Sequence, residues 1–378
     1  MKILLFINSL KIGGAQNQFV ALVQQWKLQG VDFSTAVLNT GGQYWDILHK
    51  HDIQVNVLFE GQGKTFFKRL LQLVIAPYKL RRLIKKKKIT HVYSMLEFSN
   101  LLMRVALLWE SKVKLIWGVR ISDLQQIKML YPKMYYAEKC CALLSCRTNL
   151  VICNSSKAIK EYKNFFKCFQ YELIMNGVDI TRFHKDSSFR NEFRKNCKLN
   201  QIVIGIAARI TPQKNYETLF EAIRILLKTW GKVTLLVVGS GEKEYVDSLL
   251  ELARKLGLEE YIYWAGELRE QLVSAYNAMD IFCLPSFMEG CSNSILEAMA
   301  CELPCVVTDV GDSKRIVGDE NGICISEEVK DLVLQLTKFL NFTSKQREEI
   351  GLNNRKRVME NFSLEHMAND TLTKIQKL

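Results

Sequence analysis

Short, almost uninterrupted apolar runs recur along the chain, separated by longer segments with helical spacing of apolar residues. The runs lie at residues 2–8, 32–38, 53–59, 91–94, 113–118, 151–153, 202–208, 234–238, 281–284 and 305–308. Such runs are typical of strands buried on both faces of a parallel sheet, and the segments between them are typical of covering helices. The pattern therefore predicts an α/β protein with doubly wound sheets.

The chain is long enough for two domains, because 378 residues exceed one typical domain. The apolar runs stop near the Asn176-Gly177 turn and restart at residue 202, and the intervening segment is polar. We therefore expect an N-terminal domain over residues 1–180, a linker over 181–199 and a C-terminal domain over 200–362.

The net charge of +13 needs a partner or another reason, and the candidates are nucleic acid, anionic lipid and an anionic substrate. No zinc-finger, helix-turn-helix or aromatic RNA-binding pattern is present, so nucleic acid is not an expected partner. A membrane surface or a phosphorylated substrate is favoured instead. The first apolar run is too short for a signal peptide, and no run approaches the roughly 20 residues of a spanning helix. We expect a cytosolic protein.

The cysteines give no indication of a metal site. An odd number of them, eleven, is scattered through apolar runs, which favours reduced thiols in the core. The densest group, at residues 140–153, lacks the paired spacing of zinc ligands. His49 and His51, followed by an Asp, are a weaker candidate, and surface histidines are the preferred interpretation.

Residues 66–88 combine apolar and cationic residues at helical spacing. Apolar residues recur from Phe66 to Ile84, and the segment ends in the run Lys85–Lys88. A basic amphipathic helix can lie on an anionic bilayer, where each cation is worth about 1 kcal/mol. A helix that packs on a sheet, with a solvated cationic back and an interruption at Pro77, gives the same pattern. The sequence leaves both interpretations open.

A glycine pair follows the first predicted strand. Gly13 and Gly14 let a ligand approach the backbone N–H groups of the next helix closely, although a tight turn has the same composition. The arrangement is not Gly-x-Gly-x-x-Gly, so a dehydrogenase is not expected. Further along, Arg120 follows the strand predicted at 113–118, where ligands bind in such sheets.

Two cations follow the first strand of the second half. Arg209 and Lys214 flank a Pro-containing turn, and such a pair suits a diphosphate, although an ordinary surface loop would look the same. Gly239 follows the next strand, at the start of Gly-Ser-Gly-Glu.

Two carboxylates follow the strand at 281–284. Glu289 lies in the loop, and Glu297 lies near the start of the next helix, which Ser292 or Asn293 can cap. A carboxylate can accept two hydrogen bonds from a vicinal diol, and N–H groups at a helix start bind phosphate. The segment can therefore hold a nucleotide-sugar, although a loop acid and an exposed helix acid would have the same spacing.

These motifs, in this order, resemble the family 4 retaining glycosyltransferases of the GT-B fold. They are Gly13-Gly14-Ala15-Gln16, Asn176-Gly177-Val178-Asp179, Arg209-x4-Lys214-Asn215, Val238-Gly239-Ser240-Gly241-Glu242, Glu289-x7-Glu297 and Thr308-Asp309-Val310-Gly311. The resemblance covers nearly the whole chain. It implies two Rossmann-like domains facing across a cleft, with the last helix, from about residue 363, packed on the first domain.

The resemblance also implies a role for each candidate residue. It assigns Arg209 and Lys214 to the donor diphosphate, Glu297 to the ribose hydroxyls and Glu289 to the hydroxyls of the donor sugar. The residues whose backbone is expected to approach the donor are Gly13, Gly14, Gly239, Ser292, Asn293 and Ser294.

The chemistry of glycosyl transfer agrees with these roles, because cations on the leaving diphosphate stabilise the developing charge. One well-placed donor is worth roughly 3–4 kcal/mol. The sequence has no Asp-x-Asp pair, so we expect Arg209 and Lys214 to replace a divalent metal and expect no metal cofactor. We also expect Lys214→Ala to lower turnover steeply while leaving the fold intact.

One position departs from the family pattern. Many members have a His-Asp pair near residue 118, where this chain has Gly118-Val119-Arg120. Arginine stays protonated and cannot act as a base. Front-face transfer needs little protein base, because the leaving phosphate can accept the proton. Arg120 is expected to bind the donor phosphate or an anionic acceptor.

The resemblance and the positive charge favour transfer of a hexosyl or N-acetylhexosaminyl group, from a UDP-sugar, to a saccharide or lipid-diphosphate-linked saccharide. The expected setting is the cytoplasmic face of a bacterial-type membrane, in surface polysaccharide or lipopolysaccharide synthesis. The alternatives are a nucleotide-sugar 2-epimerase of the same fold and a catalytically silent, membrane-associated scaffold. The intact set of Arg209, Lys214, Glu289 and Glu297 argues against a silent scaffold.

Overall fold

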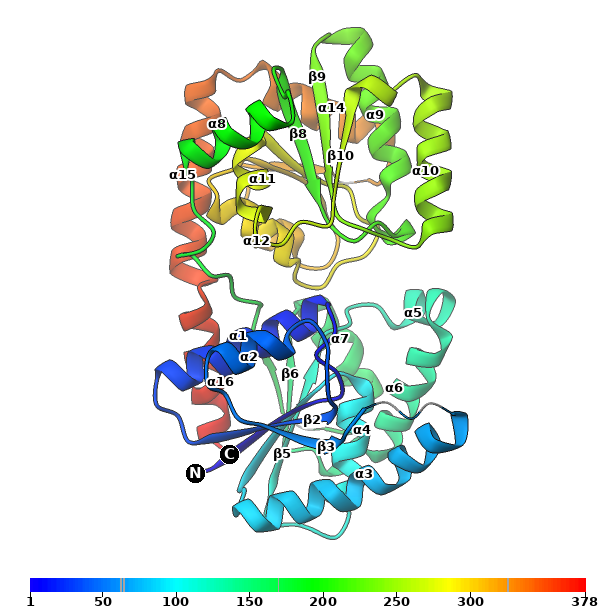
Figure 1. The fold of residues 1–378 in the computed structure, drawn as a ribbon, viewed down its shortest axis with the longest axis vertical. Helices are drawn as coiled ribbons and strands as arrows, with labels where there is room; N and C mark the ends of the chain where they lie inside the picture. Colours follow the sequence, from blue (N-terminus) through cyan, green and yellow to red (C-terminus); the bar gives the residue numbers. More distant parts are fainter. Residues whose placement is uncertain (62, 64, 169, 325) are drawn as a thin grey trace. The chain divides into compact units, whose positions relative to one another are not determined.

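The computed structural model describes residues 1–61, 63, 65–168, 170–324 and 326–378. They form two compact units, the first made of Met1–Gly177 with Leu364–Leu378 and the second of Val178–Ser363. Each unit is built around its own parallel sheet with helices on both faces (Figure 1). The prediction of two Rossmann-like α/β domains is therefore confirmed.

The first unit contains a seven-stranded sheet in the order β3-β2-β1-β4-β5-β6-β7. Its strands are β1 (Ile3–Ile7), β2 (Phe33–Asn39), β3 (Val55–Phe59), β4 (His91–Met95), β5 (Lys114–Val119), β6 (Leu150–Cys153) and β7 (Tyr171–Leu173). Its helices are α1 (Gly14–Leu28), α2 (Trp45–Lys50), α3 (Phe66–Lys87), α4 (Glu97–Ala106), α5 (Leu124–Leu130), α6 (Pro132–Leu144), η1 (Ser145–Arg147), α7 (Ser156–Phe165) and α16 (Leu364–Gln376). Every residue of the central strand β1 is buried, which explains its continuous apolar run.

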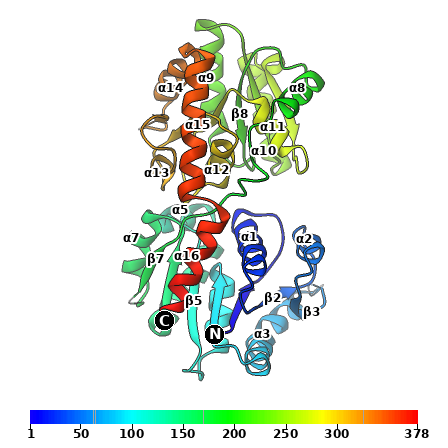
Figure 2. The same ribbon diagram turned by 90° about the vertical axis from the view of Figure 1, so that its left-hand side faces the viewer.

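The last helix, α16, packs on the first unit. The Trp26 indole N–H of α1 donates to the Ala368 carbonyl at 3.1 Å, and Lys374 pairs with Glu172 at 2.9 Å. Figure 2 shows α1 and α16 on the same face of this sheet. The opposite face is covered by α3, α4, α6 and α7, around the buried Trp117.

The second unit contains a six-stranded sheet in the order β10-β9-β8-β11-β12-β13. Its strands are β8 (Ile202–Ala207), β9 (Val233–Val238), β10 (Ile262–Gly266), β11 (Ile281–Leu284), β12 (Cys305–Thr308) and β13 (Gly322–Cys324). Its helices are α8 (Ser187–Asn196), η2 (Pro212–Lys214), α9 (Tyr216–Thr229), α10 (Lys243–Leu256), η3 (Glu259–Tyr261), α11 (Leu272–Ala278), α12 (Asn293–Ala300), α13 (Ser313–Val317), α14 (Val329–Asn341) and α15 (Ser344–Asn361).

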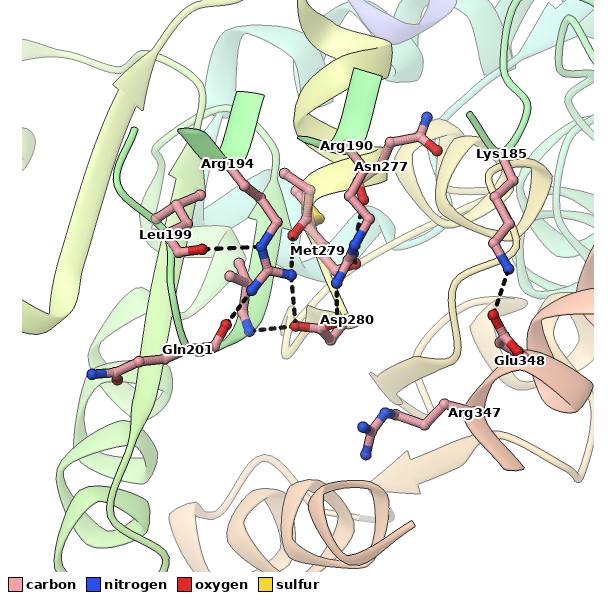
Figure 3. A network of polar contacts seen from close by, with 12 residues as sticks. Lys185, Arg190, Arg194, Leu199, Gln201, Asn277, Met279, Asp280, Arg347 and Glu348 are labelled. Carbon is pink, nitrogen blue, oxygen red and sulfur yellow. Dashed lines mark hydrogen bonds and ion pairs between the residues drawn. The ribbon is translucent and has the colours of Figure 1, made fainter. Parts of the chain in front are cut away.

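Residues 181–199, which the sequence suggested as a linker, lie within the second unit. They include α8, whose Arg190 and Arg194 both bind the Asp280 carboxylate, at 2.6 and 3.2 Å (Figure 3). These charge-assisted bonds fix α8 to the end of α11, because Asp280 lies between α11 and β11. The chain instead passes between the units at Gly177–Val178 and at Ser363–Leu364.

Candidate active site

The strand order of the second sheet defines a switch point between β8 and β11. Chain connections lead from β8 to β9 on one side, whereas β11 pairs with β8 on the other side. Ligands of doubly wound sheets bind outside the carboxyl ends of the strands at such a point. The loop after β8 carries Arg209 and Lys214, and the loop after β11 carries Glu289.

Lys214 and Glu289 form a buried ion pair at this switch point. The Lys214 Nζ lies 2.5 Å from Glu289 Oε1, and the two side chains are only 15% and 8% exposed. The Ser286 hydroxyl donates to the same oxygen at 2.8 Å, and the Ser286 carbonyl in turn accepts from Thr308 Oγ1 at 2.6 Å. The carboxylate is thus held in one orientation by Lys214 and Ser286, which follow β8 and β11, and Thr308 of β12 fixes Ser286. The sequence predicted the two charged residues but not their pairing.

Arg209 is arranged differently from Lys214. Its side chain is exposed and has no ion-pair or hydrogen-bond partner within the described ranges. A guanidinium in this state can bind a ligand without first breaking a protein contact.

Close backbone packing brings the loops after β8, β9, β11 and β12 together. Gly239 has a φ of +144°, and a Cβ there would lie 1.9 Å from the Ala208 carbonyl oxygen. Gly311 has a φ of +61°, and a Cβ there would lie 2.1 Å from the carbonyl oxygen of Glu289. Only glycine fits such positions. The structure therefore gives Gly239 a packing role, and its approach to a donor remains a prediction.

Glu297 lies in α12 and is held by a buried tyrosine. The Tyr276 hydroxyl donates to Glu297 Oε2 at 2.8 Å, and the Tyr276 ring packs edge-on against Phe183 with centroids 5.9 Å apart. Burial raises the pKa of the Glu297 carboxyl to about 7, although the Tyr276 hydrogen bond and the charge of Arg182 lower it. Glu297 therefore changes protonation near neutral pH. No sequence pattern indicated Tyr276, because a tyrosine in an apolar helix is usually core.

The start of α12 differs from the sequence prediction. Ser292 occupies the N-cap position, but its side chain makes no capping hydrogen bond and instead contacts the Ser294 hydroxyl at 3.1 Å. Ser292 therefore does not cap α12 through its side chain. The first N–H groups of a helix have no partner in the helix itself, so Asn293 and Ser294 lie where an anion can bind.

The remaining candidates lie in the first unit. Gly13 is the N-cap of α1, with an extended φ of 177°, and Gly14 is the first helical residue. A Cβ on Gly13 would meet only the end of the flexible Gln16 side chain, at 2.2 Å. The backbone there does not require glycine, so the expected approach of a ligand to it remains a prediction.

Arg120 directly follows β5 and is mostly buried without a counter-ion. Its Nη2 donates to the Tyr93 hydroxyl at 3.1 Å, whereas Nε and Nη1 are buried and have no partner among the described residues. The neighbouring strand β6 ends one residue before Asn154, whose buried Oδ1 likewise has no partner there. Burying an unpaired cation is unfavourable, so an anion is the group that would complete this site.

Helix α3 is continuous through Pro77, contrary to the predicted interruption. Proline removes a single backbone donor, and the buried residues Ala76, Leu80 and Ile84 hold the helix on the sheet across this position. A second stripe, which includes Phe67, Leu71, Val74 and Tyr78, is exposed. One stripe of α3 is therefore core and the other faces solvent, and binding of the exposed stripe to a bilayer remains a prediction.

The described part of the chain contains no helix long and apolar enough to span a membrane. Within the same residues, no group of three or more His, Cys, Asp or Glu side chains is arranged to hold a metal ion. His49 instead contacts the Trp45 carbonyl at 2.8 Å through Nδ1.

Two family models match the chain. Residues 12–182 match the Glycosyltransferase Family 4 model, and residues 188–357 match the Glycosyl transferases group 1 model. The matches divide near the observed boundary between the units.

Curated relatives include the capsular polysaccharide biosynthesis glycosyltransferase CapM of Staphylococcus aureus, 27% identical over 67% of this chain and 66% of the relative. The UDP-Gal:alpha-D-GlcNAc-diphosphoundecaprenol alpha-1,3-galactosyltransferase of Escherichia coli is 26% identical over 64% of this chain and 63% of its own length. Each match thus spans slightly less than two thirds of the relative.

Solved structures agree in fold along the whole chain. Anabaena Alr3699/HepE in complex with UDP-glucose superposes with a TM-score of 0.85 at 21% identity, covering 100% of both chains. Sucrose-phosphate synthase from Thermosynechococcus elongatus gives 0.84 at 18% identity, covering 100% of this chain and 98% of that one. With both halves matched by the family models and both sheets in the order of this fold, the chain belongs to the family 4 glycosyltransferases of the GT-B fold.

Proposed function

We propose that this protein is a retaining glycosyltransferase that moves a hexosyl or N-acetylhexosaminyl group from a nucleotide-sugar to a saccharide or lipid-linked saccharide acceptor. The buried Lys214–Glu289 pair carries the proposal. It places a cation and an oriented carboxylate together at the switch point of the second sheet, beside the exposed Arg209. A nucleotide-sugar carries a diphosphate and sugar hydroxyls next to each other, and this arrangement matches both.

In the proposed reaction, an acceptor hydroxyl oxygen bonds to the anomeric carbon from the face that the leaving group vacates. The bond between that carbon and the diphosphate oxygen breaks, and the acceptor proton passes to the leaving phosphate. Lys214 and Arg209 stabilise the charge that develops on the diphosphate, and Glu289 binds sugar hydroxyls. We propose that these cations serve where other transferases use a metal ion, and turnover measured with and without a chelator tests this.

The rest of the donor is assigned to backbone groups and to Glu297. Glu297 would accept hydrogen bonds from the ribose diol, and the backbone at Gly13, Gly14 and Ser292–Ser294 would approach the sugar and phosphates. A UDP-sugar is the favoured donor, supported by the UDP-Gal in the name of the Escherichia coli relative and by the UDP-glucose complex of HepE.

The acceptor is proposed to be anionic, in bacterial surface polysaccharide or lipopolysaccharide synthesis. Support comes from the unpaired Nε and Nη1 of Arg120 and from the roles named for relatives in capsule and lipid-linked glycan synthesis. We place the enzyme in the cytoplasm, at the inner face of the membrane, with α3 as its contact. If replacing Lys85–Lys88 by Gln leaves binding to anionic vesicles at low salt unchanged, this contact is wrong.

The decisive experiment is a screen of UDP-, GDP-, ADP- and dTDP-sugars by thermal shift and product analysis. It compares the wild type with Glu297→Ala, and with Glu297→Gln, which keeps an acceptor for Tyr276. We expect one nucleotide class to stabilise the wild type, by RT ln(1 + [L]/Kd), and to stabilise Glu297→Ala far less. The anomeric configuration of the product, read by NMR, tests retention.

The same screen separates the alternatives. Release of free nucleotide without any acceptor, with inversion at the sugar C2, would identify an epimerase. Failure of every donor to stabilise the protein would favour a silent scaffold.

A further inference from the structure

A second exposed apolar surface lies on α5 and α6 of the first unit. Met129 and Leu143 are among its most exposed side chains, at 83% and 81%. The other large apolar residues exposed there are Leu130, Tyr131 and Tyr136. On α6, Tyr136 and Leu143 lie seven positions apart, on the stripe opposite the buried Ala137 and Cys141. This stripe therefore faces outward and is not part of the core.

The exposed charges on α5 and α6 have one sign. Lys128, Lys133 and Lys139 lie on the same two helices, and residues 124–137 contain no Asp or Glu. The next acid, Glu138, is buried. Lys128 and Lys139 both approach the face of the Tyr135 ring, at 5.9 and 5.2 Å from its centroid. An apolar patch whose two helices carry only lysines as exposed charges complements an anionic lipid surface, whereas lysine is depleted in protein–protein interfaces.

The α5–α6 surface and α3 belong to one layer of the first unit. Helix α4 packs against both α3 and α6, and all three cover the same face of the sheet (Figure 1). Helices α3 and α6 each connect the carboxyl end of one strand to the amino end of another. The beginning of α3 and the α5–α6 turn therefore lie toward the carboxyl edge of the sheet, whereas the end of α3 and Leu143, at the end of α6, lie toward the amino edge.

The outward stripe of α3 changes character along its length. It is apolar at Phe67, Val74 and Tyr78 and cationic at Arg81 and Lys85. Residues 61–96 contain no Asp or Glu. The apolar half thus lies toward the same sheet edge as the α5–α6 turn, and the cationic half lies toward the opposite edge.

We infer that the α5–α6 surface is a second contact of the first unit with an anionic bilayer, acting together with the exposed stripe of α3. One amphipathic helix leaves the unit free to rotate about its axis, whereas two contacts fix its tilt. The face of the first sheet that α3, α4 and α6 cover is then turned toward the headgroups. The inference rests on the proposed function, because a lipid-linked acceptor would be held in such a bilayer.

The test measures partition of the full-length protein onto vesicles of phosphatidylglycerol and phosphatidylethanolamine, and onto vesicles of phosphatidylcholine alone. The variant carries Met129→Ser and Leu143→Ser. The control carries Leu28→Ser at the end of α1, on the other face of the unit, where Leu28 is 80% exposed. We expect the double variant to partition at least about tenfold more weakly onto the anionic vesicles, and the control to match the wild type.

Three outcomes overturn the inference. They are equal partition of variant and wild type, equal weakening by the control, and a wild type that self-associates through this surface without binding vesicles. Melting temperatures of the variants should equal that of the wild type, since the side chains are exposed. Donor stabilisation is measured in parallel. Vesicle binding without donor stabilisation refutes the proposed function alone, and donor stabilisation without vesicle binding refutes this inference alone.

Discussion

Removing Lys214 should destabilise the second unit as well as stop transfer. At 2.5 Å and an effective dielectric constant near 20, the gross attraction between Lys214 and Glu289 is about 6–7 kcal/mol. Desolvation offsets most of this attraction. Removing one partner is nevertheless expensive, because the other charge stays buried. With exposures of 15% and 8%, we expect Lys214→Met to lower the free energy of unfolding by about 3–5 kcal/mol.

A double-mutant cycle separates the ion pair from the loss of either side chain. Glu289→Gln keeps a group that can bond to Ser286, so Lys214→Met with Glu289→Gln should be more stable than Lys214→Met alone. The assay is urea unfolding, followed by tryptophan fluorescence. A matched control is Lys243→Met, because Lys243 pairs with Asp247 at the same 2.5 Å but is 87% exposed. We expect that variant to lose less than about 1 kcal/mol.

Stability and catalysis respond differently in this cycle. Turnover should fall about 100- to 1000-fold in both variants that lack Lys214, measured well below their melting temperatures. If the two substitutions are additive in stability, the buried ion pair is refuted. If the double variant recovers wild-type turnover, the assignment of Lys214 to the diphosphate is refuted. The ion pair also changes the expectation that loss of Lys214 leaves the fold unaffected.

Three further predictions concern other residues. The donor KM of the wild type should rise as the pH falls through about 7, because the Glu297 carboxyl is then protonated. Tyr276→Phe removes a hydrogen bond that lowers the pKa of Glu297, so the KM of this variant should begin to rise at a higher pH. Burial raises the pKa of Glu138 to about 8, whereas the same carboxyl in the unfolded chain has an ordinary pKa near 4.5. Between these pH values only the folded protein holds the proton, so the free energy of unfolding should fall as the pH rises, by at most about 4–5 kcal/mol. Glu138→Gln should flatten this pH dependence in urea titrations. Arg120→Met should lower transfer to phosphorylated acceptors at least about tenfold. The melting temperature should change little, because the lost hydrogen bond to Tyr93 is offset by removal of a cation that has no counter-ion, and a large drop would contradict this account.

Much of the fold could be predicted because its central strands are buried on both faces. The runs at 2–8 and 202–208 correspond to β1 and β8, at the centres of their sheets. The short edge strands were missed: β7 and β13 have three residues each, too few for a recognisable run. Gly322, although it follows an asparagine as in a typical turn, begins β13, because pairing with β12 decides its conformation.

The candidate site was predictable in its residues but not in its contacts. Loops after strand ends indicated Arg209, Lys214 and Glu289, since ligand groups of doubly wound sheets follow strands. The partner of Lys214 lies 75 positions away in sequence. No local pattern encodes such a contact, and Tyr276, which holds Glu297, had no sequence signal at all.

The sequence by itself determined which segments form strands and helices, and where charged residues follow strands, because those features depend on local periodicity and composition. The tertiary structure decided which of those residues meet. Lys214 binds Glu289 because crossover connections place β8 beside β11, and one stripe of α3 is exposed because the sheet covers only the other. Segment pairing is a property of the whole chain, since it depends on the joint burial of many distant apolar residues.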